Sequence, residues 1–133
     1  MEKELLKKGP VLDEKGRPIP GYSRKSTLVY DRKAIKAPAW RIKEWDFYQI
    51  SNERLCLQFT IGHAAYAGQV SLMLFDFIKG EKLLDLNKIL VLPFGSLHMP
   101  TDAEKDNTLS YEKGGVLMRF QTKNQKRVLT CRW

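Results

Sequence analysis

The chain has 133 residues, enough for about one domain with its own hydrophobic core. Its 43% hydrophobic and 29% charged residues are typical of a globular protein and exclude a disordered one. No apolar stretch reaches the roughly 20 residues of a transmembrane helix, and the first residues lack the apolar core of a secretion signal. The sequence therefore predicts a cytoplasmic protein without a transmembrane segment.

The net charge of +8 is distributed unevenly along the chain. Residues 1–43 hold twelve Lys/Arg and five Asp/Glu, residues 44–118 hold six and ten, and residues 119–133 hold five and none. Such basic ends can attract nucleic acid or an acidic partner. Lysines that keep sheet edges from aggregating are the favoured interpretation, because no ladder of exposed aromatics accompanies them.

Cysteine and motif content give no support for a cofactor or a metal. Cys56 and Cys131 lie in no CxxC pair and beside no histidine, so both are predicted to be reduced, small hydrophobic residues. No GxSxG, HExxH, GxGxxG or Walker-type glycine loop occurs. We expect neither a cofactor nor a metal site.

Residues 1–41 contain too many chain-breaking residues for a long helix or a central strand. Glycine or proline recurs at Gly9-Pro10, Gly16, Pro18, Pro20-Gly21 and Pro38. The segment is predicted to be an extended basic arm packed on a sheet domain of residues 42–133.

From residue 42 onward, hydrophobic residues alternate with a period of two. In residues 54–62 the alternation puts Leu55, Leu57, Phe59 and Ile61 on one face, as in a half-buried strand. The preceding strand, 42–50, is predicted to join it through a hairpin loop at residues 51–53.

Five further strands are predicted, and most are joined by hairpins. They span 69–78, 83–92, 108–112, 116–122 and 127–133, with a loop at 94–106. The pattern predicts an all-β fold, an antiparallel meander that forms a barrel or half-barrel. The last strand runs to Trp133, so it either closes on the first strand, pairs with another copy or belongs to a longer protein.

Four blocks in a fixed order, at residues 21–32, 41–50, 64–82 and 92–100, resemble the bacterial family called domain of unknown function 2804. The resemblance is collinear over roughly residues 10–132 and covers the N-terminal part of the family pattern, whose members continue with a second sheet-forming half. That family is similar to lipocalin-like proteins that include carotenoid hydratase and tocopherol cyclase. The resemblance implies a calycin-type lipocalin-like barrel with an apolar interior.

Aromatic and titratable residues in the strands are the candidate site. The residues predicted to line a ligand site are Trp45, Tyr48, Phe59, His63, Tyr66 and Phe75, and Asp46 and Asp76 are predicted candidates for proton transfer.

Structural roles compete with these assignments. The aromatics can be core residues, and His63 can be a rim histidine bonded to a backbone carbonyl. Asp76 is predicted to lie at the surface or to pair with an arm arginine such as Arg24 or Arg32.

Three functions follow as hypotheses. The first is binding of a hydrophobic small molecule, a lipid or isoprenoid-like compound. The second is a non-redox isomerase, cyclase or hydratase, and the third is a basic surface for nucleic acid or an acidic partner. A homo-oligomer through exposed edge strands is also predicted.

Overall fold

The structure is a computed structural model that describes residues 3–133, so the first two residues of the predicted arm lie outside it. The prediction of an all-β antiparallel fold is confirmed. Residues 3–133 contain nine strands and two short 3-10 helices, with no α-helix among them. None of these described elements is a helix long and apolar enough to cross a membrane.

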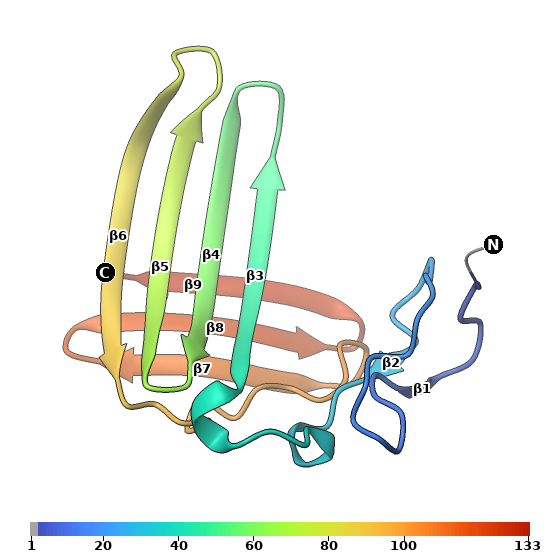
Figure 1. The fold of residues 1–133 in the computed structure, drawn as a ribbon. Coiled ribbons are helices and arrows are strands. Elements are labelled where there is room, and N and C mark those ends of the chain that lie inside the picture. The colour runs from blue at the N-terminus through green and yellow to red at the C-terminus, as the bar shows by residue number, and fades with distance from the viewer. Residues whose placement is uncertain (1–2) are drawn as a thin grey trace.

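Seven strands form two antiparallel sheets in which neighbours in sequence are neighbours in space. The first sheet contains β3 (Lys43–Ser51), β4 (Leu55–Ala64), β5 (Ala67–Asp76) and β6 (Glu81–Val91). The second contains β7 (Asn107–Lys113), β8 (Val116–Lys123) and β9 (Lys126–Arg132). In Figure 1 the strands of the second sheet run across those of the first.

The meander does not close into a barrel within residues 3–133. The loop after β6 separates it into two sheets, and β3, β6, β7 and β9 are edge strands. The last strand, β9, therefore does not close on the first strand of the meander, since among the described strands it pairs only with β8. A half-barrel remains compatible with this arrangement.

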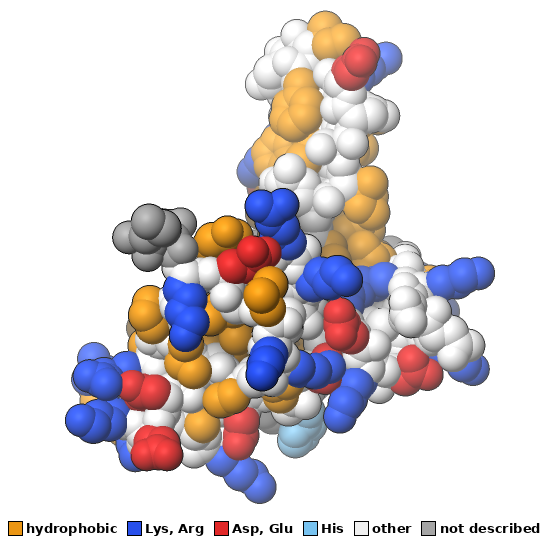
Figure 2. Space-filling view, turned by 90° about the vertical axis from the view of Figure 1, so that its right-hand side faces the viewer, with side chains coloured by type: hydrophobic (Ala, Val, Ile, Leu, Met, Phe, Trp, Pro, Cys, Tyr) orange, Lys and Arg blue, Asp and Glu red, His pale blue; other side chains and the backbone are white. Residues whose placement is uncertain are grey.

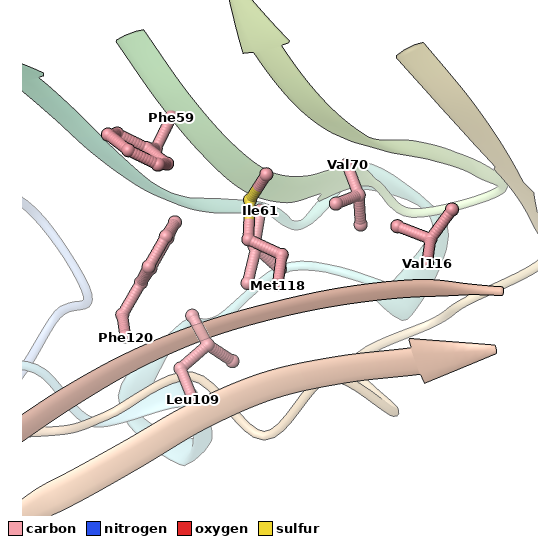
Figure 3. Close-up of a cluster of buried hydrophobic side chains, with 7 residues drawn as sticks. All are labelled: Phe59, Ile61, Val70, Leu109, Val116, Met118 and Phe120. Atoms are coloured by element: carbon pink, nitrogen blue, oxygen red, sulfur yellow. The ribbon is translucent and has the colours of Figure 1, made fainter. Parts of the chain in front are cut away.

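The core lies where the two sheets face each other. Phe120 meets Tyr48 and Phe59 edge-on, with ring centroids 4.8 and 6.4 Å apart. Figure 3 shows the cluster, which consists of Phe59, Ile61 and Val70 from the first sheet and Leu109, Val116, Met118 and Phe120 from the second. The apolar interior implied by the family resemblance is thus filled by side chains between the sheets.

The first sheet extends beyond the second. Its β3–β4 and β5–β6 turns project well past β7–β9 (Figure 1), and hydrophobic side chains lie along this projecting part in Figure 2. Exposed large hydrophobic residues near those turns are Ile50, Phe77, Ile78 and Leu83.

Residues 3–42 form the N-terminal segment, most of which lies beside one end of β7–β9, with its last part below the first sheet (Figure 1). They contain two-residue strands β1 (Gly9–Pro10) and β2 (Leu28–Val29), paired in parallel, and the helices η1 (Arg32–Ala34) and η2 (Ala39–Arg41). Lys8 Nζ lies 2.7 Å from Asp102 Oδ2, and the Tyr30 N–H donates to the Thr101 carbonyl at 2.8 Å. These two contacts attach the segment to the loop before β7.

Candidate functional site

A buried polar pair forms at the base of the first sheet. The β3–β4 register pairs Ser51 with Cys56, and it therefore sets Glu44 directly opposite His63. Both side chains point toward the same face because directly opposed residues share a face. The His63 Nε2 atom lies 3.0 Å from Glu44 Oε2, and the His63 side chain is 0% exposed.

The hydrogen bonds of His63 define its tautomer. The Ala65 N–H donates to His63 Nδ1 at 3.0 Å, so the imidazole proton is on Nε2 and is donated to Glu44. The Tyr30 hydroxyl and the Arg32 guanidinium also donate to the Glu44 carboxylate. One carboxylate thus joins β3, β4 and the N-terminal segment.

Burial lowers the pKa of His63 below its usual value, and the charge of Arg32 lowers this pKa further. Burial also raises the pKa of Tyr30. A neutral imidazole with both nitrogens bonded and no solvent access positions its neighbours and does not exchange protons with a substrate. His63 is therefore neither at the rim nor bonded to a carbonyl.

Two glycines make room for large side chains on opposite faces of the first sheet. A Cβ on Gly62 would lie 2.4 Å from the Trp45 Cβ, and a Cβ on Gly68 would lie 2.5 Å from the Gly62 carbonyl oxygen and 2.9 Å from the His63 Cβ. Gly68 is paired with His63, and Gly62 is paired with Trp45. The His63 imidazole and the Trp45 indole can lie where they do because the residue paired with each is a glycine, which has no side chain.

A groove of about 590 Å³ lies on the face of the first sheet that points away from the second sheet. One row across the sheet consists of Trp45, Gly62, Gln69 and Ile89, in the order β3 to β6. The next row toward the base has Ala64 and Ala67 at its centre and Lys43 on β3. The groove is lined by residues of both rows and by Phe47 and Thr60. Small residues on the central strands and large ones on the edge strands create the hollow.

The walls of the groove are exposed although they are apolar. Trp45 is 64% and Ile89 is 63% exposed, while Gly62 at the floor is buried. His63 belongs to the lining through its backbone, since its side chain points to the opposite face and has no exposure. An apolar groove of this volume is in the size range of small-molecule sites.

A second, smaller hollow of about 150 Å³ lies beside β3 on the inner face. It is lined by Asp46, Tyr48, Tyr30 and Arg127, among others. Burial raises the pKa values of Asp46 and Tyr48, and the nearby Arg127 opposes both shifts. The Arg127 guanidinium lies 5.1 Å from the centre of the Tyr48 ring.

Asp76 lies at the far end of β5 and has a local role. Its carboxylate accepts hydrogen bonds from the N–H groups of Ile78 and Lys79 and lies 3.1 Å from Arg54 Nε. The bond from Lys79 is the main cause of its lowered pKa, assisted by Arg54. Both predicted alternatives were wrong. Asp76 is 1% exposed and so does not lie at the surface, and the arm arginines have other partners, since Arg24 pairs with Glu4 and Arg32 with Glu44.

The residues predicted from the sequence do not converge on one site. Trp45 lines the groove, Phe59 is in the core, and Tyr66 is exposed in the β4–β5 turn. Phe75 is on the groove face but outside the groove lining, next to Lys82. Of the two candidates for proton transfer, Asp46 shares a hollow with Tyr48, whereas Asp76 is at the far end of β5.

Sequence reasoning missed the residues that shape the two sites. The position of Glu44 opposite His63 could have been found from the β3–β4 register, had the length of the β3–β4 loop been known. Gly62 and Gly68 could have been noticed as glycines that flank the tight β4–β5 turn. Ile89 carries no signal in the sequence beyond its place in an apolar strand.

Comparison with known proteins gives a family and no individual relative. A search of curated proteins and a search of solved structures each find no match to the chain. A family model described as "Domain of unknown function (DUF2804)" matches residues 2–133, nearly the whole chain. The chain therefore belongs to the DUF2804 family.

Proposed function

We propose that the chain binds a hydrophobic small molecule, such as a lipid or an isoprenoid-like compound, in the groove between Trp45 and Ile89. The observation that carries this proposal is the pair of exposed apolar walls above a floor of glycine and alanine. Leaving these walls in water has a free-energy cost, which a bound apolar molecule would remove.

The form of the groove supports a flat or extended ligand. The small side chains of Ala64 and Ala67, both half-buried, leave the floor of the groove shallow and apolar, so a ring or an acyl chain can lie against it. Gln69 and Thr60 supply the neutral polar groups of the lining, and Lys43 is its only charged residue. This lining favours a ligand that is mainly apolar.

A neutral probe tests the proposal without charge attraction to this basic chain. Titration with N-phenylnaphthylamine should give a saturable rise in probe fluorescence. Ile89→Glu should weaken binding by about tenfold or more, because an unpaired carboxylate beside an apolar ligand is unfavourable. Val128→Glu, a matched change of a 55% exposed residue in β9, should bind like the parent. Equal binding by both variants would contradict the site.

The open edges of the first sheet support a second proposal, self-association through edge strands. β3 and β6 each have one neighbour among the described strands, which leaves backbone donors and acceptors unpaired along the other side. Sedimentation velocity over a range of protein concentrations should reveal a dimer or larger species. A monomer at every concentration would contradict this proposal and leave the groove proposal intact.

A further inference from the structure

Four large hydrophobic side chains are exposed at the base of the first sheet. They form what we call the basal patch, which consists of Tyr66, Val91, Leu92 and Phe94. The Leu92 N–H donates to the Tyr66 carbonyl at 2.8 Å, and the Phe94 N–H donates to the Ala65 carbonyl at 3.0 Å. The β4–β5 turn and the loop after β6 therefore form one continuous surface.

The backbone of the basal patch is held in uncommon conformations. Ala65, Leu92 and Phe94 have φ angles of 60°, 52° and 41°, in the left-handed region that non-glycine residues rarely adopt. Gly95, with a φ of 89°, packs so closely on Arg32 that a Cβ there would lie 2.8 Å from the guanidinium carbon. The loop thus exposes Leu92 and Phe94 from a fixed backbone.

The segments that carry the basal patch and the helices η1 and η2 are rich in exposed cations. Exposed acids beside them include Asp31, which precedes η1, and Glu112, which lines a hollow with Val91 and Leu92 and lies 3.7 Å from Arg132. Residues 32–43, 62–75 and 89–101 include no Asp or Glu. Lys33, Arg41 and Lys43 are exposed there, and none of them forms a salt bridge with a described residue. Glu44, the nearest acidic residue in sequence to Lys43, is buried and bonded to Arg32.

These cations lie next to the patch. Arg32 of η1 contacts Gly95, and the next residue in η1 is Lys33. Lys43 is paired with Ala64, at the start of the β4–β5 turn. In Figure 1 η1, η2, the β4–β5 turn and the loop after β6 all lie at the lower end of the molecule.

We propose that the basal patch docks on an anionic phospholipid surface. Aromatic and aliphatic side chains that enter the headgroup region, surrounded by Lys and Arg at the level of the phosphates, are the common design of peripheral membrane binding. A second copy fits less well, since a two-fold contact through this patch would bring the same cations together. Tyr66 and Phe94 carry rings on which a nucleic-acid base could stack, whereas the exposed aliphatic side chains of Val91 and Leu92 favour the boundary between headgroups and acyl chains.

Vesicle sedimentation tests this docking, and it does so whether or not the groove binds a ligand. The chain should sediment with vesicles of equimolar phosphatidylcholine and phosphatidylglycerol, and much less with phosphatidylcholine alone. Binding should fall as salt is added. Lys33→Glu combined with Arg41→Glu should weaken the partition constant by at least roughly 25-fold, because each cation near the surface contributes about a factor of five.

Matched variants separate the patch from the overall charge and from misfolding. Tyr66→Ser combined with Phe94→Ser should also lose vesicle binding, whereas Val128→Ser and Lys126→Glu, which change exposed residues of β9, should retain it. Circular dichroism should show that every variant is folded. Equal binding to neutral and anionic vesicles, or no binding by the folded parent chain, would overturn the proposal. So would a Tyr66/Phe94 double variant that binds vesicles normally but changes its oligomeric state.

Discussion

The His63 imidazole and the Glu44 carboxylate lie 3.0 Å apart on adjacent strands, and both side chains are buried. The other imidazole nitrogen accepts the Ala65 N–H, and Glu44 also accepts bonds from Tyr30 and Arg32. A single neutral histidine therefore connects the β4–β5 turn to the N-terminal segment through one carboxylate.

This arrangement predicts a pH dependence of stability. His63 is held neutral in the folded chain, with its pKa below the usual 6.5, so the unfolded chain binds the proton more tightly. His63 therefore makes its full contribution to the free energy of unfolding above about pH 6.5. This contribution is lost as the pH falls through the pKa that His63 has in the folded chain, which is the lower of the two. Urea unfolding from about pH 8 to about pH 5 should show stability falling toward acid.

Two histidine variants serve as the control for that measurement. His63→Gln keeps a donor and an acceptor in the same place without titrating, so its stability should vary less with pH than that of the parent. His98→Gln, at an exposed loop position, should keep the parent's slope. An unchanged slope in His63→Gln would mean that other groups cause the acid sensitivity.

Removal of the Glu44 carboxylate should be more damaging than removal of the imidazole. Glu44→Ala leaves the Arg32 charge and the Tyr30 and His63 donors without their acceptor. The expected loss is about 3–5 kcal/mol in the free energy of unfolding, as for other broken buried ion pairs. Glu44→Gln should lose less, because the amide oxygen still accepts one bond. A Glu44→Ala variant as stable as the parent would contradict the role given to this network.

Gly68→Ala should lower the free energy of unfolding of the chain through a clash within the first sheet. The added Cβ would meet the Gly62 carbonyl oxygen at 2.5 Å, and backbone cannot move aside as a flexible side chain can. A loss of about 1–3 kcal/mol is expected from denaturant unfolding. Gly9→Ala is the matched control, because its nearest atom would be 4.0 Å away and its φ is not positive.

Phe120→Ala tests whether the two sheets depend on one core. Its ring contacts Tyr48 of β3 and Phe59 of β4 from the opposite sheet. Truncation should cost about 3–5 kcal/mol. A single cooperative transition that shifts as a whole is expected in both near- and far-ultraviolet circular dichroism. Two separate transitions would show that the sheets unfold independently.

The strands could be predicted because their signal is local. Alternation at Leu55 to Ile61 and turn residues such as Gly114-Gly115 gave strand positions to within a few residues. The division into two crossing sheets has no such signal. It depends on a loop in which Leu92, Phe94 and His98 adopt positive φ angles, and none of these residue types indicates that conformation.

The buried pair was missed because the hairpin register was wrong. A loop at residues 51–53 would pair Ile50 with Arg54 and so set Glu44 opposite Thr60, on the other face. In the structure the Asn52 side chain accepts the N–H groups of Arg54 and Leu55, and Ser51 pairs with Cys56. The register between β4 and β5 pairs Leu55 with Asp76 and so brings the neighbouring Arg54 to that carboxylate, which explains the wrong partner assigned to it.

Several expectations stay predictions. These are the cytoplasmic location, the lipocalin-like relationship and the boundary between an arm and a sheet domain near residue 41. Confirmation of the family adds no activity, since the family description names none.

Amide chemical-shift mapping tests the binding groove most directly. The ¹⁵N-labelled chain is titrated with N-phenylnaphthylamine, and the shifts of each amide are followed. Binding in the groove predicts the largest changes at Gly62, Ala64, Ala67 and Gly68, with β9 unaffected. Changes confined to the projecting end of the sheet or to the second sheet, or no saturable change at all, would contradict the proposed function.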